Sequence, residues 1–503
     1  MGVRDWFRRT FGRAESRRDA SYVGGRRSRR NAGWVLGDVS GNAAVAGSLV
    51  ELRRRSRDHA RNNRYAHHAL IETACYLAGS LPQSAISVPE GASDRERARI
   101  ESVNRTVDGR FRAWSRVCSV EGRETFSGLL YRAILGWLTS GESFTRRRVR
   151  RLDDGLPVPL QLDLLEADLV DHTRSERLDT GGWIVQGVEY SPIGARQAYH
   201  MWRWHPGETL ISGLQTPYST VRVDARTVCH LYGAPIERPG QARGVPWLHA
   251  VIQDLYDFAG FQDADRVRMR AAASQMAVVE TEDRFCEGQD DLPTGLNPLR
   301  DSSGDILERI RPGQIGYMQA GQRVSWNTPP TTPQVGEHAR VELHGQAVGA
   351  LMPYELFSGD LSDTSYSSIM FGLGSYRQLV SLLRRDVVLP FWTNPVWEWF
   401  VELGQAAGVL PDEAGPVRWV HPPWPLVDPV KDARGKLIAV RGGWDTLSRV
   451  IAETGEDPDE VLAEQRRLQE WARAHGIVLD GIPSTATLGG QVQETLSPRL
   501  DND

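Results

Sequence analysis

The residues of this chain that could do chemistry are histidines and closely spaced carboxylates. His200 and His205 lie five residues apart in a segment of strand-like alternation, which puts them on opposite faces and prevents shared metal ligation. Asp254 and Asp257 share one face of an expected helix, opposite its apolar stripe. Because a general acid needs an apolar pocket, we interpret this pair as solvated. The sequence therefore predicts no catalytic residue and no metal site.

Sequence signatures of enzymes are missing as well. The chain has no HExxH, GxSxG or GxGxxG pattern, and FGLGSY at 371–376 has only two of the required glycines within a helical pattern. Lys431 and Lys436 are the only lysines, and Leu437 follows where a phosphate-binding loop needs Ser or Thr. An ATP-driven motor is excluded. We expect a protein without a cofactor that is not an enzyme.

Helical and strand-like patterns together predict an α+β protein. Short alternating runs with turn residues between them fill positions 142–232, and Ser191-Pro192-Ile193-Gly194 predicts a hairpin turn. Trp392, Trp397 and Trp399 have no basic residues between them, which favours packing over base stacking. Helices are predicted at about 49–81, 94–114, 121–139, 334–351, 368–389 and from 458 onward.

The longest helical pattern begins at Pro246. If it extends to about Glu280, the helix is about 50 Å long at 1.5 Å per residue. A helix of that length spans separate parts of a subunit or packs beside copies of itself. We therefore expect its apolar stripe to pack against neighbouring subunits: Leu248, Val251, Ile252, Leu255 and Phe258.

Positive charge is concentrated at the N-terminus. The first 64 residues hold sixteen arginines against six acidic residues, whereas the 503-residue chain has a net charge of -4. Residues 1–48 are predicted to form a flexible basic arm that contacts nucleic acid or acidic protein surfaces, or acts only as a solubilising tail. The candidate contact residues are Arg8, Arg9, Arg17, Arg18, Arg26, Arg27, Arg29 and Arg30.

The sequence predicts neither a membrane protein nor a disulfide-rich one. No uncharged apolar stretch approaches the length of a membrane span, and arginines stand where a secretory signal needs apolar residues. The four cysteines lie far apart without a CxxC pair. We expect a protein of a reducing cytoplasm.

Several segments, in order, resemble the lambda-type family of tailed-phage portal proteins. They include RNNRYAHHALIETACYLAGS at 61–80, GESFTRRR at 141–148 and RGVPWLHAVIQDL at 243–255. The most specific is GALMPYELFSGDLSDTSYSSIMFGLGSYRQ at 349–378. The similarity spans about residues 50–470, and the basic arm has no counterpart in it.

The resemblance implies a portal fold with an α/β wing, long stem helices, a small clip domain and a helical C-terminal crown, in a cyclic homo-oligomeric ring. It implies twelve copies at one capsid vertex of the virion, assembled in the host cytoplasm. Double-stranded DNA passes through the ring, and terminase, head-tail adaptors and the major capsid and scaffold proteins are further partners. The corresponding residues are the wing at 49–245, first stem helix at 246–280, clip at 281–333, second stem helix at 334–352, tunnel loop at 353–367, tunnel helix and wing return at 368–425, crown at 426–479 and a disordered tail at 480–503.

By this resemblance, the end of the tunnel loop lies beside the DNA. A sliding channel should avoid many Lys or Arg contacts, since each one stabilises bound DNA by counterion release. The segment has hydroxyl and acidic side chains and no basic residue, so we expect a neutral or negative lumen with weak, non-specific DNA contact. The DNA-facing residues are Ser358, Gly359, Asp360, Leu361, Ser362, Asp363, Thr364, Ser365, Tyr366, Ser367 and Ser368.

Two other function classes stay open at this stage. One is a metal-dependent phage nuclease or hydrolase, whose DNA cleavage would be lost on changing Asp254 or Asp257. The other is a non-portal capsid or DNA-binding scaffold protein that acts through its basic arm. Deleting residues 1–48 would abolish the activity of such a scaffold protein but leave a portal ring intact.

Overall fold

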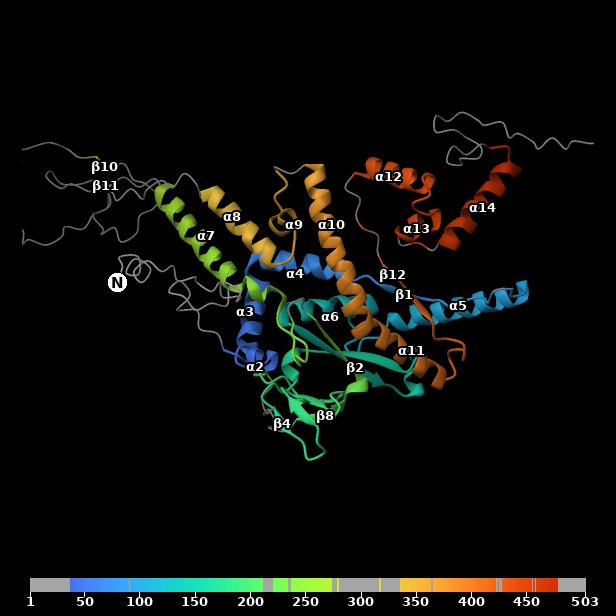
Figure 1. Cartoon of the computed structure of the whole chain (residues 1–503), viewed down its shortest axis with the longest axis horizontal. Helices are drawn as coiled ribbons and strands as arrows, with labels where there is room; N and C mark the ends of the chain where they lie inside the picture. The colour runs from blue at the N-terminus through green and yellow to red at the C-terminus, as the bar shows by residue number, and fades with distance from the viewer. Residues whose placement is uncertain are drawn as a thin grey trace, which may run out of the picture.

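The structure, a computed structural model, describes a large part of the chain (Figure 1). Four sets of residues named above lie outside that part: the arginines of the basic arm, most of the clip, Asp363 with Thr364, and the C-terminal tail. The described residues are 37–89, 91–210, 220–233, 237–273, 278–279, 316–317, 335–362, 365–421, 424, 428–454, 456 and 458–477.

The N-terminal helical region consists of three helices, α2 (Gly41–Ala46), α3 (Leu49–Asn62) and α4 (Arg64–Leu77). The single helix expected over 49–81 is wrong, because Asn63 has an extended backbone and its side chain accepts hydrogen bonds from Tyr65 N and Ala66 N. An asparagine in this position starts a new helix by satisfying amides that have no partner in the first turn.

Helix α2 also changes the limit of the basic arm. Asn42 donates from Nδ2 to the carbonyl of Gly240 and accepts from the amide of Ala242 at 2.8 Å. Residues 41–46 are thus a folded helix tied to a distant loop, so the prediction of a flexible arm over 1–48 is wrong for its last residues.

Two sheets form the β-rich section that the sequence predicts over 142–232. One has the order β3-β2-β9 and the other is a five-stranded antiparallel meander, β4-β5-β6-β7-β8. The predicted hairpin is confirmed, because Gly194 N donates to Ser191 O between β6 and β7. The strands are β2 (Glu142–Val149), β3 (Leu160–Leu165), β4 (Glu176–Arg177), β5 (Trp183–Val185), β6 (Val188–Tyr190), β7 (Arg196–Met201), β8 (Val221–Asp224) and β9 (Val228–Tyr232).

Helices pack against the three-stranded sheet and enclose the main core. α5 (Asp94–Ser115) and α6 (Phe126–Ser140) begin at Ser93 and Thr125, whose hydroxyls cap them. Between α4 and α5 lies β1 (Leu81–Ser84), which pairs antiparallel with β12 (Val417–Val420). An aromatic cluster fills the space between these elements, and it consists of Phe111, Trp114, Phe126, Trp392, Trp397 and Phe400.

The long helical pattern after Pro246 divides into a short 3-10 helix, Trp247–Ala250, and α7 (Ile252–Ala273). With 22 residues, α7 is about 33 Å long. It runs beside α8 (Val335–Gly349), and Figure 1 shows both rising away from the sheets. The ring of Phe261, near the middle of α7, meets His338 of the first turn of α8 edge-on at 5.1 Å.

After α8 the chain forms α9 (Tyr354–Ser358) and α10 (Tyr366–Leu383), and the latter rises through the centre of Figure 1. The expected end of this helix at Leu389 is wrong. A π-helical segment, Arg384–Thr393, carries the chain past Pro390 into α11 (Asn394–Ala406). A π-helical turn widens the backbone, which accommodates a proline that can neither donate a hydrogen bond nor fit a regular helix.

The tryptophans that follow are packing residues, as predicted. Trp392, Trp397 and Trp399 are buried, and each indole N–H donates to an acceptor within the chain. The C-terminal helices α12 (Pro429–Arg441), α13 (Leu447–Ala452) and α14 (Pro458–Ala474) lie together to one side of the body in Figure 1.

Two short strands pair in parallel: β10 (Val278–Val279), in the range predicted for the first stem helix, and β11 (Gly316–Tyr317), in the predicted clip. The prediction of helix up to residue 280 is therefore wrong at 278–279. Cys75, Cys118 and Cys229 form no disulfide bond in the described part of the chain. No helix there combines the length and hydrophobicity that crossing a membrane requires.

Candidate functional site

The segment between α8 and α10 contains two left-handed turns and is fixed to the body by a buried aromatic side chain. Leu351 has a left-handed backbone (φ 58°) that reverses the chain after α8, and Gly359 (φ 72°) ends α9. Phe357 is fully buried between these turns and stacks on Tyr65 of α4 at 6.0 Å. The first part of the expected tunnel loop is therefore packed against α4.

Asp360 organises the exposed end of this segment. Its carboxylate accepts from the amide of Ser362 at 3.1 Å, from the Ser362 hydroxyl at 2.5 Å and from the Tyr354 hydroxyl at 3.2 Å. These hydrogen bonds, with those of Ser362 contributing most, lower the pKa of Asp360 to about 2. Asp360 is therefore a carboxylate at any physiological pH.

Arg340 is a residue of this site that sequence reasoning missed. It lies on α8, and its Nη2 approaches Asp360 Oδ2 at 3.5 Å. The loop itself has no basic residue, but a guanidinium partly offsets the negative charge of Asp360. Because Arg340 and Asp360 are twenty residues apart, no local pattern links them.

The other predicted loop residues whose side chains the structure describes are mostly exposed. Leu361 is 64% exposed although it is apolar. Ser365 caps α10 by accepting from the amide of Ser368 at 3.2 Å. Ser358 lies at the end of α9 and Tyr366 at the start of α10, and Ser362 and Ser367 are solvent-facing.

The five residues predicted to pack against neighbouring subunits are instead part of the chain's own core. Leu248 and Leu255 are fully buried, and Val251, Ile252 and Phe258 are at most 5% exposed in the single chain. Residues of α4, α8 and α9 belong to the same core cluster. The prediction of subunit packing through this stripe is therefore corrected: its partner is the same chain.

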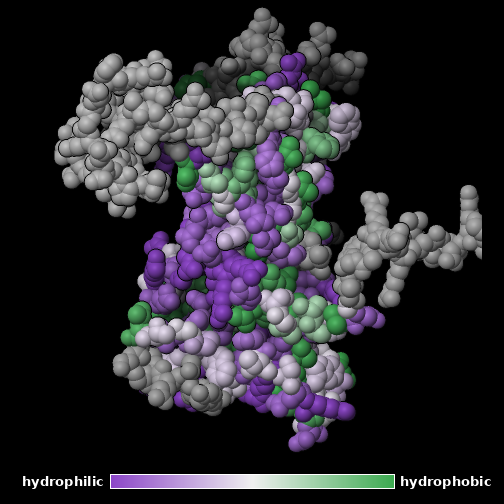
Figure 2. Space-filling model, turned by 90° about the vertical axis from the view of Figure 1, so that its left-hand side faces the viewer, coloured by the Kyte–Doolittle hydropathy of each residue, from purple (hydrophilic) through white to green (hydrophobic). Residues whose placement is uncertain are grey.

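A different set of apolar side chains on these helices is exposed. Beyond Phe258 no described side chain of α7 is buried. We call the exposed set the outer stem surface; it consists of Tyr256, Phe261, Val267 and Met269 of α7 with Val341 and Val348 of α8. Figure 2 views the molecule from the side where these helices rise, and hydrophobic patches there interrupt a hydrophilic surface.

The two candidate catalytic carboxylates are exposed to solvent, as the sequence predicts. Asp254 and Asp257 are both exposed on α7, and Asp257 accepts a hydrogen bond from Gln253 one turn earlier. His200 is buried, and its Nε2 lies 3.0 Å from Glu189 Oε2. These positions confirm a solvated carboxylate pair and a packed histidine.

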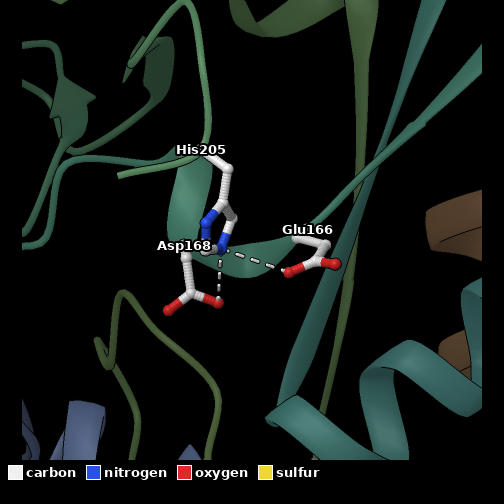
Figure 3. Close-up of side chains that lie close together, drawn as sticks. All are labelled: Glu166, Asp168 and His205. Atoms are coloured by element: carbon white, nitrogen blue, oxygen red, sulfur yellow. Dashed lines mark ion pairs between the residues drawn. The ribbon is translucent and has the colours of Figure 1, made fainter. Parts of the chain in front are cut away.

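His205 belongs to a cluster that the sequence did not predict. Figure 3 shows its ring between Glu166 and Asp168, with Nε2 3.3 Å from Glu166 Oε2 and 3.9 Å from Asp168 Oδ2. Three such ligand atoms could hold a metal ion. Arg57 Nη2, however, already bonds to Asp168 Oδ2 and lies 3.7 Å from Glu166 Oε2. A guanidinium that neutralises both carboxylates favours an ion-pair cluster over a cation site.

Comparison with known proteins assigns the chain to a family. Residues 27–384 match the sequence model described as phage portal protein, lambda family. The chain belongs to the lambda family of phage portal proteins. A probable portal protein of Halomonas phage phiHAP-1 is 25% identical over 455 residues, which cover 87% of this chain and 83% of the relative. The resemblance inferred from the sequence is confirmed.

Solved structures similar to this member of the portal family come from gene transfer agent (GTA) particles. The neck of an empty GTA particle matches with a TM-score of 0.43 and 15% identity, over 82% of this chain and 94% of that chain. The virion of a native GTA particle matches with a TM-score of 0.42 and 14% identity, over 84% of this chain and 100% of that chain.

In this portal-family chain, two of the segments that carry the resemblance meet at a buried carboxylate. Glu142, from the GESF segment, accepts from Arg243 Nε of the RGVPW segment at 2.7 Å, from His230 Nε2 at 2.8 Å and also from Arg53. Burial alone would raise the pKa of Glu142, but Arg243 and Arg53 hold it far below its usual range. These motif residues therefore join two distant segments of the fold.

Proposed function

We propose that copies of this chain form a closed ring at one capsid vertex, twelve in the particle, through which double-stranded DNA is packaged and ejected. Membership of the portal family supports the role. The outer stem surface is the observation that carries the assembly. Apolar groups exposed on helices that rise from the body gain free energy when a second copy covers them. When one surface of each copy contacts a different surface of the next copy, and this contact repeats around a rotation axis, the copies close into a ring.

The tunnel loop is the proposed point of DNA contact. Its exposed end offers serine hydroxyls and the Asp360 carboxylate, and the nearby Arg340 lies 3.5 Å from that carboxylate. A surface of this kind lacks the unpaired guanidinium groups that would hold phosphates by counterion release. Weak contact suits a channel in which DNA must move.

We propose no chemistry for the ring itself. A separate terminase ATPase would supply the energy of packaging, in keeping with a chain without a phosphate-binding loop. The clip at 281–333 would face terminase and, later, the head-tail adaptors, and residues 426–479 would form the crown. Major capsid and scaffold proteins would be further partners, and the basic arm would contact DNA, capsid protein or scaffold protein.

Negative-stain electron microscopy of the purified full chain tests the assembly. We expect class averages of an annulus with rotational symmetry and an open centre. Solution scattering that gives only a compact monomer under every assembly condition would contradict the proposal.

A loop variant tests the contact with DNA. Leu361→Arg adds a guanidinium at an exposed loop position, and Val430→Arg adds one at an exposed position on α12 as the matched control. In assembled rings, the loop variant should bind DNA more tightly and show a steeper dependence of affinity on salt, by about 0.9 in slope for each phosphate contacted. Equal effects of the two variants would place the DNA elsewhere.

A further inference from the structure

A cavity of about 510 Å³ lies between the end of α10, β12 and the crown helices. Its wall includes several cationic and aromatic side chains, and neither the DNA channel nor the stem accounts for them. Those used below are Arg384, Arg385, Arg418, Trp424 and Arg449. The volume is in the range of sites that bind small molecules.

Arg384 is the unusual member of this wall. Arg384 is 5% exposed. Its Nη2 donates to the carbonyl of Tyr76, and its guanidinium lies 5.0 Å from the centre of the Trp424 ring. Its Nε is buried and has no acceptor in the described part of the chain. The hydrogen bonding of this cation is therefore incomplete.

Comparison with the other buried arginines shows what Arg384 lacks. Arg53 and Arg243 are also buried, and both donate to the carboxylate of Glu142. No described carboxylate forms an ion pair with Arg384, and burial alone lowers its pKa to about 10. A buried charge without a counter-ion is costly to a fold, so an anion that enters the cavity would be stabilised there.

The neighbouring groups limit what the anion can be. Trp424 already contacts Arg384 and Arg377, so its ring is not a free stacking surface for a base. Two carboxylates line the crown side, Glu456 and Glu453, and the latter is paired with Lys436 at 3.0 Å. Four guanidinium groups also line the cavity, and three of them already have partners in the chain: Arg385 with Asp386, Arg418 with Gln83 and Arg449 with Asp445. The hydrogen bonding of Arg384 is incomplete, and a phosphate offers its donors three or four oxygens where a carboxylate offers two.

We propose that this cavity binds a phosphate group, with the guanidinium of Arg384 as its principal donor and Arg418 and Arg449 as supporting cations. Inorganic phosphate and the phosphate of a nucleotide or of DNA share this chemistry. The crown would then be fixed to the body by an anion held between them. The site needs only one chain, so it does not depend on ring formation.

Titration calorimetry of the full chain with inorganic phosphate, at constant ionic strength set by chloride, tests the site. We expect saturable binding by the parent chain and by Arg55→Met, which removes an exposed cation that pairs with Glu51 on α3 and does not line the cavity. Arg384→Met should abolish the binding. If that variant does not fold, Arg384→Lys, which keeps the charge but loses the fork of donors, should weaken binding at least tenfold.

Two further ligands separate the possible sources. A dinucleotide with one phosphodiester that competes with inorganic phosphate would indicate a nucleic-acid phosphate, and its failure to compete would indicate free phosphate or a phosphomonoester. Acetate that binds as tightly as phosphate would overturn the proposal, since the site would then be a carboxylate receptor. The proposal would also be overturned if the parent chain gave no heat of phosphate binding. The same holds if neither Arg384→Met nor Arg384→Lys changed that binding.

Discussion

Arg243 Nε donates to Glu142 Oε1 at 2.7 Å, although 101 residues separate the two in sequence. Both side chains are fully buried, and the same guanidinium donates to the carbonyls of Ala167 and Gln186. One ion pair thus joins the start of β2 to the segment that leads into α7. Through it, the β-rich section sets the position of the stem helices.

Glu142→Gln should destabilise the chain by about 3–5 kcal/mol, because it leaves Arg243 buried without a counter-ion and leaves Arg53 with only Asp168, at 4.0 Å. Denaturant unfolding of the variant measures the loss. Glu402→Gln is the control, since Glu402 pairs with Arg147 at 2.8 Å but is 60% exposed, and its loss should cost less than about 1 kcal/mol. If the two variants lost the same free energy of unfolding, the buried ion pair would contribute no more to stability than the exposed one.

Stability should fall as pH decreases from about 6.5 toward 4. Burial lowers the pKa of His230 to about 4, even though Glu142 accepts from its ring. The unfolded chain, with a histidine pKa of about 6.5, then binds a proton that the folded chain does not, so stability is complete above that pH and declines below it. The loss from this residue is on the order of 3 kcal/mol.

Thermal unfolding of the parent chain and of His230→Gln between pH 8 and pH 4 checks this expectation. The variant should show a shallower decline. Burial also lowers the pKa of His200, which stays in the variant, so the decline should not vanish. Identical pH profiles would show that His230 does not titrate as the structure requires.

Two substitutions in α7 should separate folding from assembly. Leu255→Ala removes a fully buried side chain and should cost about 2–5 kcal/mol of stability. Val267→Asp changes a side chain that is 55% exposed and should alter stability by less than about 0.5 kcal/mol while preventing ring formation. Melting curves and size-exclusion chromatography together measure both effects. Rings that persist in Val267→Asp would remove this part of the outer stem surface from the subunit interface.

Gly244→Ala should destabilise the chain severely. A Cβ at this position would collide with the carbonyl oxygen of Gly141. That oxygen is a backbone atom and cannot move aside as a flexible side chain could. Gly374→Ala is the control, because nothing lies within 4 Å of the added carbon and alanine favours the helix by about 1 kcal/mol. Soluble yield and melting temperature measure the contrast. A Gly244→Ala variant as stable as the parent would show that the two segments do not approach so closely.

Local signals in the sequence predicted most elements but not where all of them end. The strands of the β-rich section and the start of α5 at Asp94 follow from alternation, turn residues and a serine cap. The break at Asn63 is also a local capping signal, but apolar spacing on both sides of it resembles one long helix. The passage through Pro390 has no such signal, because a proline normally ends or kinks a regular helix and the chain here continues through a π-helical segment.

The candidate site was predicted in part. The solvated position of Asp254 follows from residue type and spacing, whereas the tunnel-loop residues are inferred from the resemblance to the portal family. The contact of Arg340 with Asp360 and the cavity beside Arg384 join separate elements, so periodicity along one helix does not reveal them.

The sequence by itself determined the family, the mixed α+β class and the apolar faces of the helices, because motifs and periodicity are local properties of the chain. Only the tertiary structure decided which surface covers each face. The stripe through Leu255 is filled from within the chain, while Val267 on the same helix is not. A hydrophobic pattern shows that a side chain favours burial, and the positions of the other elements determine what buries it.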